Sequence, residues 1–440
     1  MKTHPFTENP HRTLVSLSLP VLLSMTAEPL TALVDTAFVA SLGSVALAAL
    51  GVGTTTLSTL FWIFNFLNIG AQTEVAQADG KGESERASGI ASLSMLMALG
   101  FSVLIILFVY PNAGWLSALM GASGDILNEA VRYIQIRTFG APAVLLMAVS
   151  FGVLRGLQDM RTPLWIALGV NLLNVFLDWV LVFGKLGFPS MAVAGSALAS
   201  TISQWLGAIF GVFIIAKKLG LSRDFTLKQA KRLLQVGGDL FVRTGLLNFF
   251  LAFSTRTATQ IGADAGAAHQ AIRQVFLFTS LALDAYASTV QSLVGFFIGQ
   301  DALNWAKKVV TVGAKWALGT GIALGTGMWL GRGLVMDLLV PATAFAVFIP
   351  AWAVSALSQP INAIAFLTDG AHWGTGDYRF LRNAMLMATA VGIMAIRFID
   401  PSSPNALLYL WLAATAWATT RAIFGWLRVN PGIGNSPFKA

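Results

Sequence analysis

The chain has 440 residues, of which 56% are hydrophobic and only 11% are charged, and its mean hydropathy is +0.71. A soluble domain averages about 25% charged residues, so this composition excludes a soluble globular protein and predicts a polytopic membrane protein. The absence of cysteine excludes disulfides, thiolate metal sites and cysteine nucleophiles, and the four scattered histidines lack zinc-site spacing. The net charge of +8 comes from basic residues in short loops rather than on a face that would bind nucleic acid.

Apolar segments of about 20 residues, the length that crosses a bilayer, recur along the whole chain and predict an all-α fold. They cover roughly residues 13–40, 46–78, 88–110, 130–154, 162–184, 190–216, 243–262, 270–298, 305–331, 340–367, 380–399 and 405–427, which is about twelve spans. Most basic residues fall in the loops that are inside if both termini are cytoplasmic, and only Lys185, Arg332 and Arg397 are clearly outside. The positive-inside rule therefore predicts a multi-pass protein of the inner (cytoplasmic) membrane with both termini in the cytoplasm.

The longest polar interruption is AKKLGLSRDFTLKQAKRLLQ, residues 216–235. It predicts an N-lobe of residues 1–216, a basic cytoplasmic linker of residues 217–242 and a C-lobe of residues 243–440. Two interpretations of the interruption remain open: an amphipathic helix on the inner leaflet, or an ordinary solvated linker.

The two halves also resemble each other when one is shifted by 219 residues along the chain. This single register pairs Gln72 with Gln291, Val75 with Val294 and Gly80 with Gly299, which indicates an internal duplication. With six spans per half, the repeats share one orientation, so we expect two six-helix bundles related by a pseudo-two-fold axis along the membrane normal. A V-shaped pair of bundles with a central cleft is typical of a transporter.

The first apolar segment contains two carboxylates, Glu28 and Asp35, about two turns apart on one helical face. A carboxylate in a span is costly unless it pairs, faces the interior or binds a proton, so Asp35 is a functional candidate. Glu28 precedes Pro29, and support near a kink is an equally good explanation for it. Pro20 also removes a hydrogen bond from this helix, and the sequence leaves both a fixed kink and a switch open.

The fifth apolar segment contains NLLNVFLD, in which Asn171, Asn174 and Asp178 form one polar stripe at helical spacing. With Asp35, the stripe offers carboxylate and amide oxygens that suit a proton network or a sodium ion. The alternative role for these side chains is interhelical hydrogen bonding without a transport function.

In the second half, the charges most clearly within or beside spans are Asp284, Asp369 and Arg256. Asp369 lies in LTDGAHWGTGD, where a helix-capping or loop role competes with a transport role. Asp284 corresponds to Asn65 in the duplication, which favours a cleft-facing position for it. Arg256 either pairs with one of these acids or snorkels outward.

Four segments of the first half are similar to those of one known family. LVDTAFVASLG, GVLRGLQDMRTP, NLLNVFLDWVLVFG and VAGSALAST resemble the multidrug and toxic compound extrusion (MATE) family, and ALDAY and LTDG in the second half are similar to its DinF-like branch. The resemblance covers essentially the whole chain.

The resemblance implies a twelve-helix secondary exporter that exchanges organic, often cationic and aromatic, compounds for protons or sodium. It implies that Asp35, Asn174 and Asp178 are coupling residues, that Ser200 stands where the family usually has threonine, and that Pro20 is the point where the first helix bends. Other branches use acids on the seventh and tenth helices for sodium, but the seventh span here offers Arg256 and no acid.

The sequence thus predicts a proton-coupled multidrug exporter, with sodium at Asp35, Asn174 and Asp178 as the alternative coupling ion. A lipid-linked saccharide flippase of the same superfamily is the alternative function. A membrane-embedded enzyme would need a nucleophile, metal cluster or cofactor motif, and none is convincingly placed. We therefore expect no enzymatic activity and no cofactor, and as partners small organic substrates and the lipid bilayer, with the chain a monomer.

Overall fold

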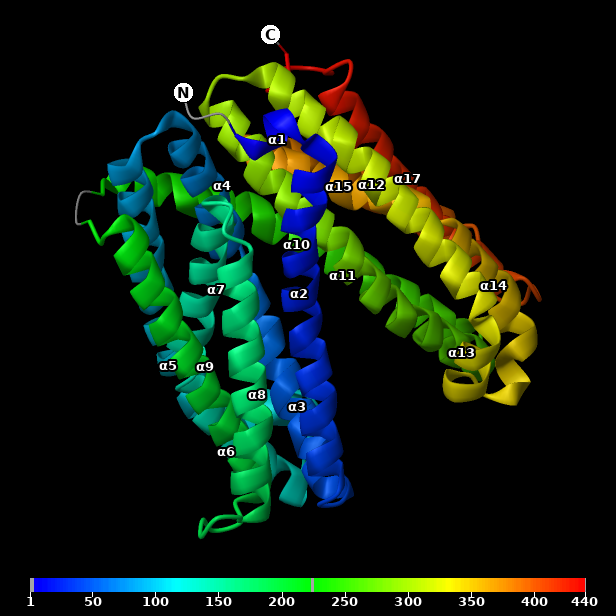
Figure 1. Cartoon of the computed structure of the whole chain (residues 1–440). Helices are drawn as coiled ribbons and strands as arrows, with labels where there is room; N and C mark the ends of the chain where they lie inside the picture. Colours follow the sequence, from blue (N-terminus) through cyan, green and yellow to red (C-terminus); the bar gives the residue numbers. More distant parts are fainter. Residues whose placement is uncertain (1–3, 223–224, 440) are drawn as a thin grey trace. The chain divides into compact units, whose positions relative to one another are not determined.

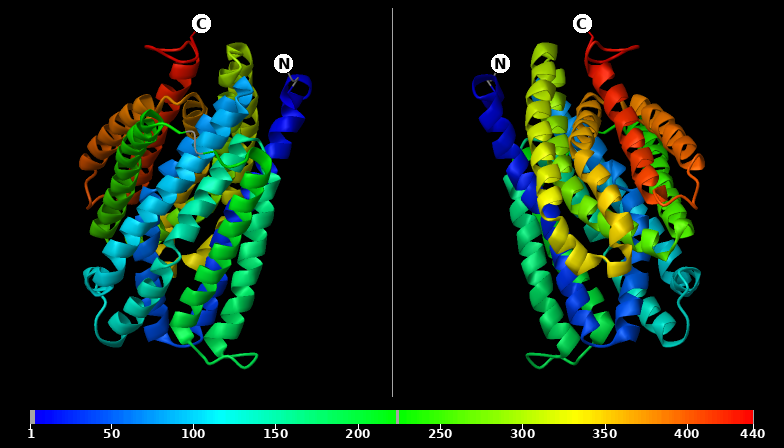
Figure 2. Two further views of the ribbon diagram at one scale, coloured as in Figure 1. Left: turned by 90° about the vertical axis from the view of Figure 1, so that its left-hand side faces the viewer. Right: turned by 90° about the vertical axis from the view of Figure 1, so that its right-hand side faces the viewer.

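Helices make up all the regular structure of the described chain. The computed structural model describes residues 4–222 and 225–439, except for the side chains of residues 227 and 228. Every regular element in these ranges is helical (Figure 1). Figure 2 shows two of them side by side, α8 (Arg161–Phe183) and α9 (Ala192–Leu219), joined by a short loop. The predicted all-α fold is confirmed.

Two of the expected spans are bent. Ten helices of the described chain are long and apolar enough to cross a membrane, and up to twelve spans result if each of two bent helix pairs counts as one. The pair α6 (Gly124–Thr138) and α7 (Ala141–Gly156) bends by 51°, and the pair Ala342–Leu357 and α15 (Gln359–Thr375) bends by 45°. Pro142 and Pro360 lie in the first turn of the second helix of each pair, where proline ends the preceding helix because it lacks an N–H donor. The segments 130–154 and 340–367 are therefore broken rather than continuous helices.

The chain separates into two compact bundles. We call Leu23–Gly237 the N-terminal bundle, and Met1–Leu22 with Gly238–Ala440 the C-terminal bundle. The helices wholly within the N-terminal bundle are α3 (Ser44–Ile63), α4 (Phe66–Lys81), α5 (Ser84–Leu119), α6, α7, α8 and α9. Those wholly within the C-terminal bundle are α1 (Pro5–Glu8), α11 (Ala263–Gly299), α12 (Leu303–Leu330), α13 (Arg332–Leu339), η1 (Ala342–Ala344), α14 (Phe345–Leu357), α15, α16 (Tyr378–Arg397) and α17 (Ala406–Val429). Both α2 (Pro10–Ala40) and α10 (Leu227–Ile261) contribute to both bundles.

The start of the chain packs in the C-terminal bundle, which differs from the expected N-lobe of residues 1–216. Phe6 and Leu14 are fully buried in a cluster with Phe297 and other C-terminal residues. The hydroxyl of Ser18 donates to Thr289 Oγ1 at 3.1 Å. Apolar burial therefore assigns the first part of α2 to the second half of the sequence.

The basic segment before the seventh span is largely helical, not a linker reaching residue 242. Helix α10 begins at Leu227 and continues without a break to Ile261, while Arg223 and Asp224 lie outside the described residues. Leu233 and Val236 are buried, and Arg232 forms an ion pair of 2.7 Å with Glu74 of α4. The amphipathic pattern of the segment thus packs its apolar side against protein.

The internal duplication is visible where helices cross closely. A Cβ atom on Gly152 of α7 would lie 2.4 Å from the backbone oxygen of Asn68 of α4, and one on Gly370 of α15 would lie 2.1 Å from that of Ala287 of α11. Asn68 and Ala287 are 219 residues apart (287 − 68), whereas the two glycines are 218 apart (370 − 152). The same glycine-mediated crossing therefore recurs in each bundle. The offset between the two halves changes by one residue between the first helix of each crossing and the helix that carries the glycine.

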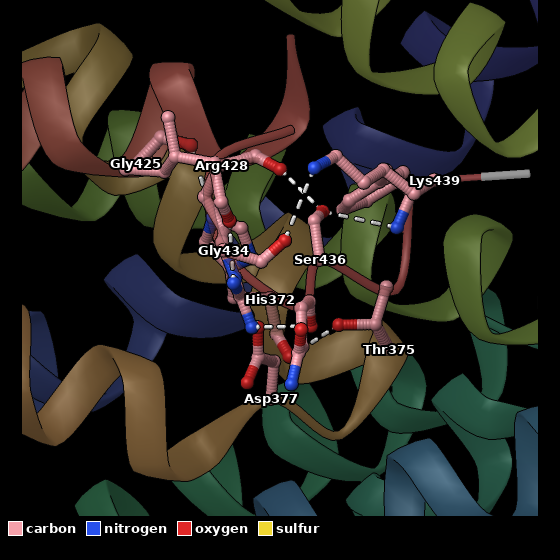
Figure 3. A network of polar contacts seen from close by, with 11 residues as sticks. His372, Thr375, Asp377, Gly425, Arg428, Gly434, Ser436 and Lys439 are labelled. Carbon is pink, nitrogen blue, oxygen red and sulfur yellow. Dashed lines mark hydrogen bonds and ion pairs between the residues drawn. The ribbon is translucent and has the colours of Figure 1, made fainter. Parts of the chain in front are cut away.

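The end of the chain is held against the C-terminal bundle by a polar network (Figure 3). Arg428 of α17 donates to Asp377 Oδ2 at 2.8 Å and to the carbonyl of Ile433 at 2.6 Å. Ser436 donates to the carbonyl of Arg428 at 2.5 Å, and Phe438 is fully buried. This terminal segment is thus part of the bundle core.

Candidate functional site

The predicted coupling residues come together in the N-terminal bundle. Asp35 lies on α2, Asn174 and Asp178 on α8, and Ser200 on α9. The Asn174 amide satisfies both neighbours when its nitrogen faces Asp35: it then donates to Asp35 Oδ1 at 3.1 Å and accepts from the Ser200 hydroxyl at 3.3 Å. Three helices are therefore joined through one buried amide.

The carboxyl groups of Asp35 and Asp178 lie side by side. They are within hydrogen-bonding reach of each other, and Asp178 is fully buried whereas Asp35 is half-buried. Neither oxygen of Asp178 accepts a well-aligned bond from a donor among the described residues, although Ser196 is nearby. Neither acid forms a salt bridge within the described chain. Two such carboxyls can bond to each other only if one carries a proton.

The remaining candidates of the first half lie outside this contact. Asn171 is half-buried one turn before Asn174 on α8, and no bond joins it to the acids. Glu28 lies about two turns before Asp35 on α2 and makes no direct polar contact with a described residue. Pro20 lies inside an uninterrupted α2, two residues before Leu22, where this helix leaves the C-terminal bundle. It therefore belongs to a different bundle from Asp35.

A basic residue beside the acid pair was not anticipated from the sequence. Arg137 of α6 is only 9% exposed and donates from Nη1 to Gln204 Oε1 of α9 at 2.8 Å. Its charge acts on Asp35 and Asp178, and also on Glu28. The signal was available, since Arg137 is an arginine within the apolar segment 130–154.

The QDMRTP motif positions the helix that carries Asn174 and Asp178. Asp159 precedes α8, accepts from the Thr162 N–H at 3.0 Å and from its hydroxyl at 2.6 Å, and forms an ion pair with Lys218 of α9. Partial burial alone would raise the pKa of Asp159, but the bonds from Lys218 and Thr162 outweigh it and hold the pKa below its usual value. The motif is therefore a cap and an α8–α9 clamp, not part of the acid pair.

The acid of the tenth span is fully engaged in ion pairs. Asp369 is buried within α15, where its Oδ2 accepts from Arg421 of α17 at 2.6 Å and also from Arg243 of α10. The two guanidinium groups also stack on Trp417 at 4.5 Å and Trp373 at 5.2 Å. Of the two alternatives for Asp369, the capping or loop role is wrong, because long-range packing brings two arginines to it.

The other two candidates of the second half are not in that triad. Arg256 is exposed on α10 and has no ion pair within the described chain, so of its two alternatives the pairing with an acid is wrong and the outward position remains. Asp284 is half-buried on α11 and interacts electrostatically with Arg421. The described chain also holds no group of three or more His, Cys, Asp or Glu side chains suited to a metal ion.

Sequence relatives are found over nearly the whole chain. A family model, MatE, matches residues 20–180. "Protein DETOXIFICATION 44, chloroplastic" of Arabidopsis thaliana is 29% identical over 446 residues, covering 96% of this chain and 82% of that protein. "DNA damage-inducible protein F" of Escherichia coli is 28% identical over 428 residues, covering 95% and 92%.

Solved structures share the fold. "Outward-facing conformation of a multidrug resistance MATE family transporter of the MOP superfamily" aligns with a TM-score of 0.87 at 21% identity, covering 97% of each chain. "Crystal structure of MATE in the bent conformation" aligns with the same TM-score, identity and coverage. The family model over residues 20–180, the relatives and the shared helical fold together make this chain similar to the MATE transporters.

Proposed function

We propose that this protein is a secondary active exporter of small organic compounds, driven by protons that bind at Asp35 and Asp178. The observation that carries the proposal is a pair of adjacent carboxyl groups in the N-terminal bundle with no salt-bridge partner in the described chain. Two like charges so close together disfavour double ionisation, so the pair retains a proton easily and releases it when a competing cation approaches. Proton and cationic substrate then exclude each other, which is the requirement for antiport.

The supporting residues act through bonds to this pair. Asn174 donates to Asp35 and accepts from Ser200, so its amide links the protonation state of Asp35 to α9. Protonation of Asp35 weakens the bond from the amide, because a neutral carboxyl is a poorer acceptor than a carboxylate. We expect α2 to shift in response, because Pro20 weakens this helix near Leu22, where it passes from one bundle to the other.

A sodium ion is the alternative driver. The carboxyl groups of Asp35 and Asp178, the amide oxygen of Asn174 and the hydroxyl of Ser200 are hard oxygen ligands of the kind that sodium takes. Two of these oxygens are already engaged, because the Asn174 amide oxygen accepts from Ser200 and Asp35 Oδ1 accepts from the Asn174 nitrogen. Fewer free oxygens therefore remain than the five or six of a full shell. Protons are therefore the preferred coupling ion. We further propose that the protein acts as a monomer in the inner membrane, with both termini in the cytoplasm.

Transport in proteoliposomes tests the proposal. Purified protein is reconstituted, and efflux of a fluorescent organic cation is measured under an imposed pH gradient, under an imposed sodium gradient and with neither. We expect the pH gradient alone to drive efflux. Efflux driven only by sodium would replace the proton in the proposal, and transport of a lipid-linked saccharide without efflux of organic cations would support the flippase instead.

A further inference from the structure

Arg137 is a buried cation that contacts no acid of the described chain directly. It is 9% exposed, it lies in the last turn of α6 at the break of a bent span, and it forms no salt bridge within the described chain. Its guanidinium donates a hydrogen bond to a neutral group, the amide oxygen of Gln204. Burying the charge of Arg137 without a salt bridge is energetically costly. We therefore expect this positive charge to compensate a negative charge that is present during only part of the transport cycle.

The guanidinium is held in place by the surrounding backbone and by α9. A Cβ atom on Gly140 would lie 3.1 Å from Arg137 Nη1 and 3.3 Å from Thr201 Oγ1, so the absence of a side chain at Gly140 leaves room for both groups. Gln204, which accepts from Arg137, lies four residues after Ser200 on α9 and therefore on the same helical face. Ser200 in turn contacts Asn174.

A continuous polar path thus joins the cation to the acid pair. It runs from Arg137 to Gln204, one turn along α9 to Ser200, and through Asn174 to Asp35. Each step except the helical turn is a hydrogen bond, at 2.8, 3.3 and 3.1 Å. The cation is therefore connected to the acids but separated from them by neutral groups.

The charged and titratable groups around Arg137 come from few elements. Helix α2 contributes Glu28 and Asp35, α8 contributes Asp178, and α6 itself contributes Tyr133. Helix α5 brings Tyr110, which packs on Phe139 at 5.4 Å, and α3 contains no titratable residue. The mid-section of α9 offers only neutral polar groups to this region.

We propose that Arg137 is a positioning residue of the transport site, a fixed positive charge held back by Gln204 that compensates the Asp35–Asp178 pair when it loses its proton. The proposal rests on the proton coupling proposed above. A cation in direct contact would keep the acids permanently ionised, as two arginines do for Asp369, and would abolish their exchange of protons. A cation that neutral side chains separate from the acids lowers the free-energy cost of ionising them and leaves the pair free to bind protons or substrate.

The test compares four proteins in the same proteoliposome assay: wild type, Arg137→Gln, Arg137→Lys and Gln204→Glu. Efflux is measured as a function of the pH on the side from which substrate is loaded. Without the positive charge the pair ionises only at higher pH, so we expect Arg137→Gln to move the midpoint of the profile upward by about one pH unit. Arg137→Lys keeps the charge and should stay near the wild-type midpoint.

Gln204→Glu places a carboxylate directly on Arg137 and cancels its charge while leaving the arginine in place. We expect it to move the midpoint in the same direction as Arg137→Gln. If both variants fold and slow efflux equally at all pH values without moving the midpoint, Arg137 has only a structural role and the proposal is overturned. Gln204→Glu keeps the test decisive if Arg137→Gln does not fold.

A measurement without transport separates this inference from the proposed function. The infrared C=O band of protonated carboxyl groups is followed during a pH titration of detergent-solubilised protein, and Asp35→Asn with Asp178→Asn identifies the part of the band due to the pair. An upward shift of that titration in Arg137→Gln supports the inference even if sodium drives efflux. An unshifted titration overturns it even if wild-type efflux follows the pH gradient.

Discussion

The two bundles share a helical scaffold but place their buried charges differently. Position 35 of the N-terminal bundle corresponds to Ser254 of the C-terminal bundle at the 219-residue offset (254 − 35). At the 218-residue offset that aligns Gly152 with Gly370, Asp178 corresponds to Ile396 (396 − 178). The acid pair thus has no counterpart in the second bundle, although the helices that would carry it are present.

The converse holds for the ion triad of the C-terminal bundle. Arg243 corresponds to Ser24 (243 − 24), and Asp369 corresponds to Phe151 (369 − 151). In the N-terminal bundle, two carboxyl groups share a site and the nearby cation does not contact them. In the C-terminal bundle, a single carboxyl group is bonded to two cations. Duplication therefore preserved the glycine-mediated helix crossings, which depend on shape, while the charged side chains diverged.

Asp35→Asn is the strongest test of this asymmetry. The change keeps size and hydrogen bonding but removes titration, so we expect efflux in proteoliposomes to fall to the level of empty liposomes while the protein remains folded. The matched control is Asp125→Asn, which changes an exposed acid of the same bundle. Wild-type efflux by Asp35→Asn would show that the acid pair is not the coupling site.

Asp369→Asn should instead act on stability. Removing the carboxylate leaves two buried guanidinium groups without their partner, which costs about 3–5 kcal/mol. We expect a clear loss of thermal stability in detergent, with Asp337→Asn, an exposed acid of the same bundle, as the neutral control. A stable Asp369→Asn protein that has lost proton coupling would mean that both bundles carry coupling acids.

Because both bundles contain the same glycine-mediated crossing, we expect Gly152→Ala and Gly370→Ala to lower the stability of the protein equally. Each new methyl group would overlap a backbone oxygen of the neighbouring helix, and overpacking of this kind costs about 1–3 kcal/mol. Gly169→Ala in α8 and Gly319→Ala in α12 are the matched controls, because no atom lies within 4 Å of the added group. Thermal unfolding of the four variants measures the comparison, and a large effect in one bundle alone would contradict a common scaffold.

Pro20→Ala tests whether α2 transmits events between the bundles. The substitution restores a donor for the carbonyl of Ser16 and stiffens the helix shortly before Leu22. We expect turnover to fall several-fold with little change in substrate binding, and a smaller pH-dependent distance change between spin labels on α2 and α8. Unchanged transport and an unchanged distance response would confine the proton's effect to the acid pair itself.

The smallest expected effect concerns the clamp between Asp159 and Lys218. The folded-state pKa of Asp159 is below its usual value of about 3.9, so the clamp contributes stability above that pH and loses it as the pH falls through the folded pKa. Because the ion pair is partly exposed, we expect Asp159→Asn to cost about 1 kcal/mol or less at neutral pH. The difference from wild type in thermal unfolding should begin to shrink as the pH falls below about 3.9 and should vanish once the pH is below the folded pKa. A difference that persists there would assign the effect to Thr162 rather than to charge.

Much of the fold followed from local properties of the sequence. Long apolar segments predicted the spans because a bilayer requires about 20 such residues. Helical periodicity placed Asn174 and Asp178 on one face of α8, and the cost of a charge in hydrocarbon singled out Asp35. The same logic would have found Arg137, since it applies to arginine within an apolar segment as well as to aspartate.

Other features depended on contacts between residues far apart in the chain, and only the tertiary structure decided them. The assignment of Met1–Leu22 to the C-terminal bundle follows from the burial of Phe6 and Leu14 against α11 and α12, which no local pattern predicts. The partners of Asp369 come from α10 and α17, so its ion triad appears only after packing. Sequence determined which side chains are costly in a membrane, because that cost belongs to the residue itself. Structure decided which of them are compensated, because compensation requires a second group brought close by the fold.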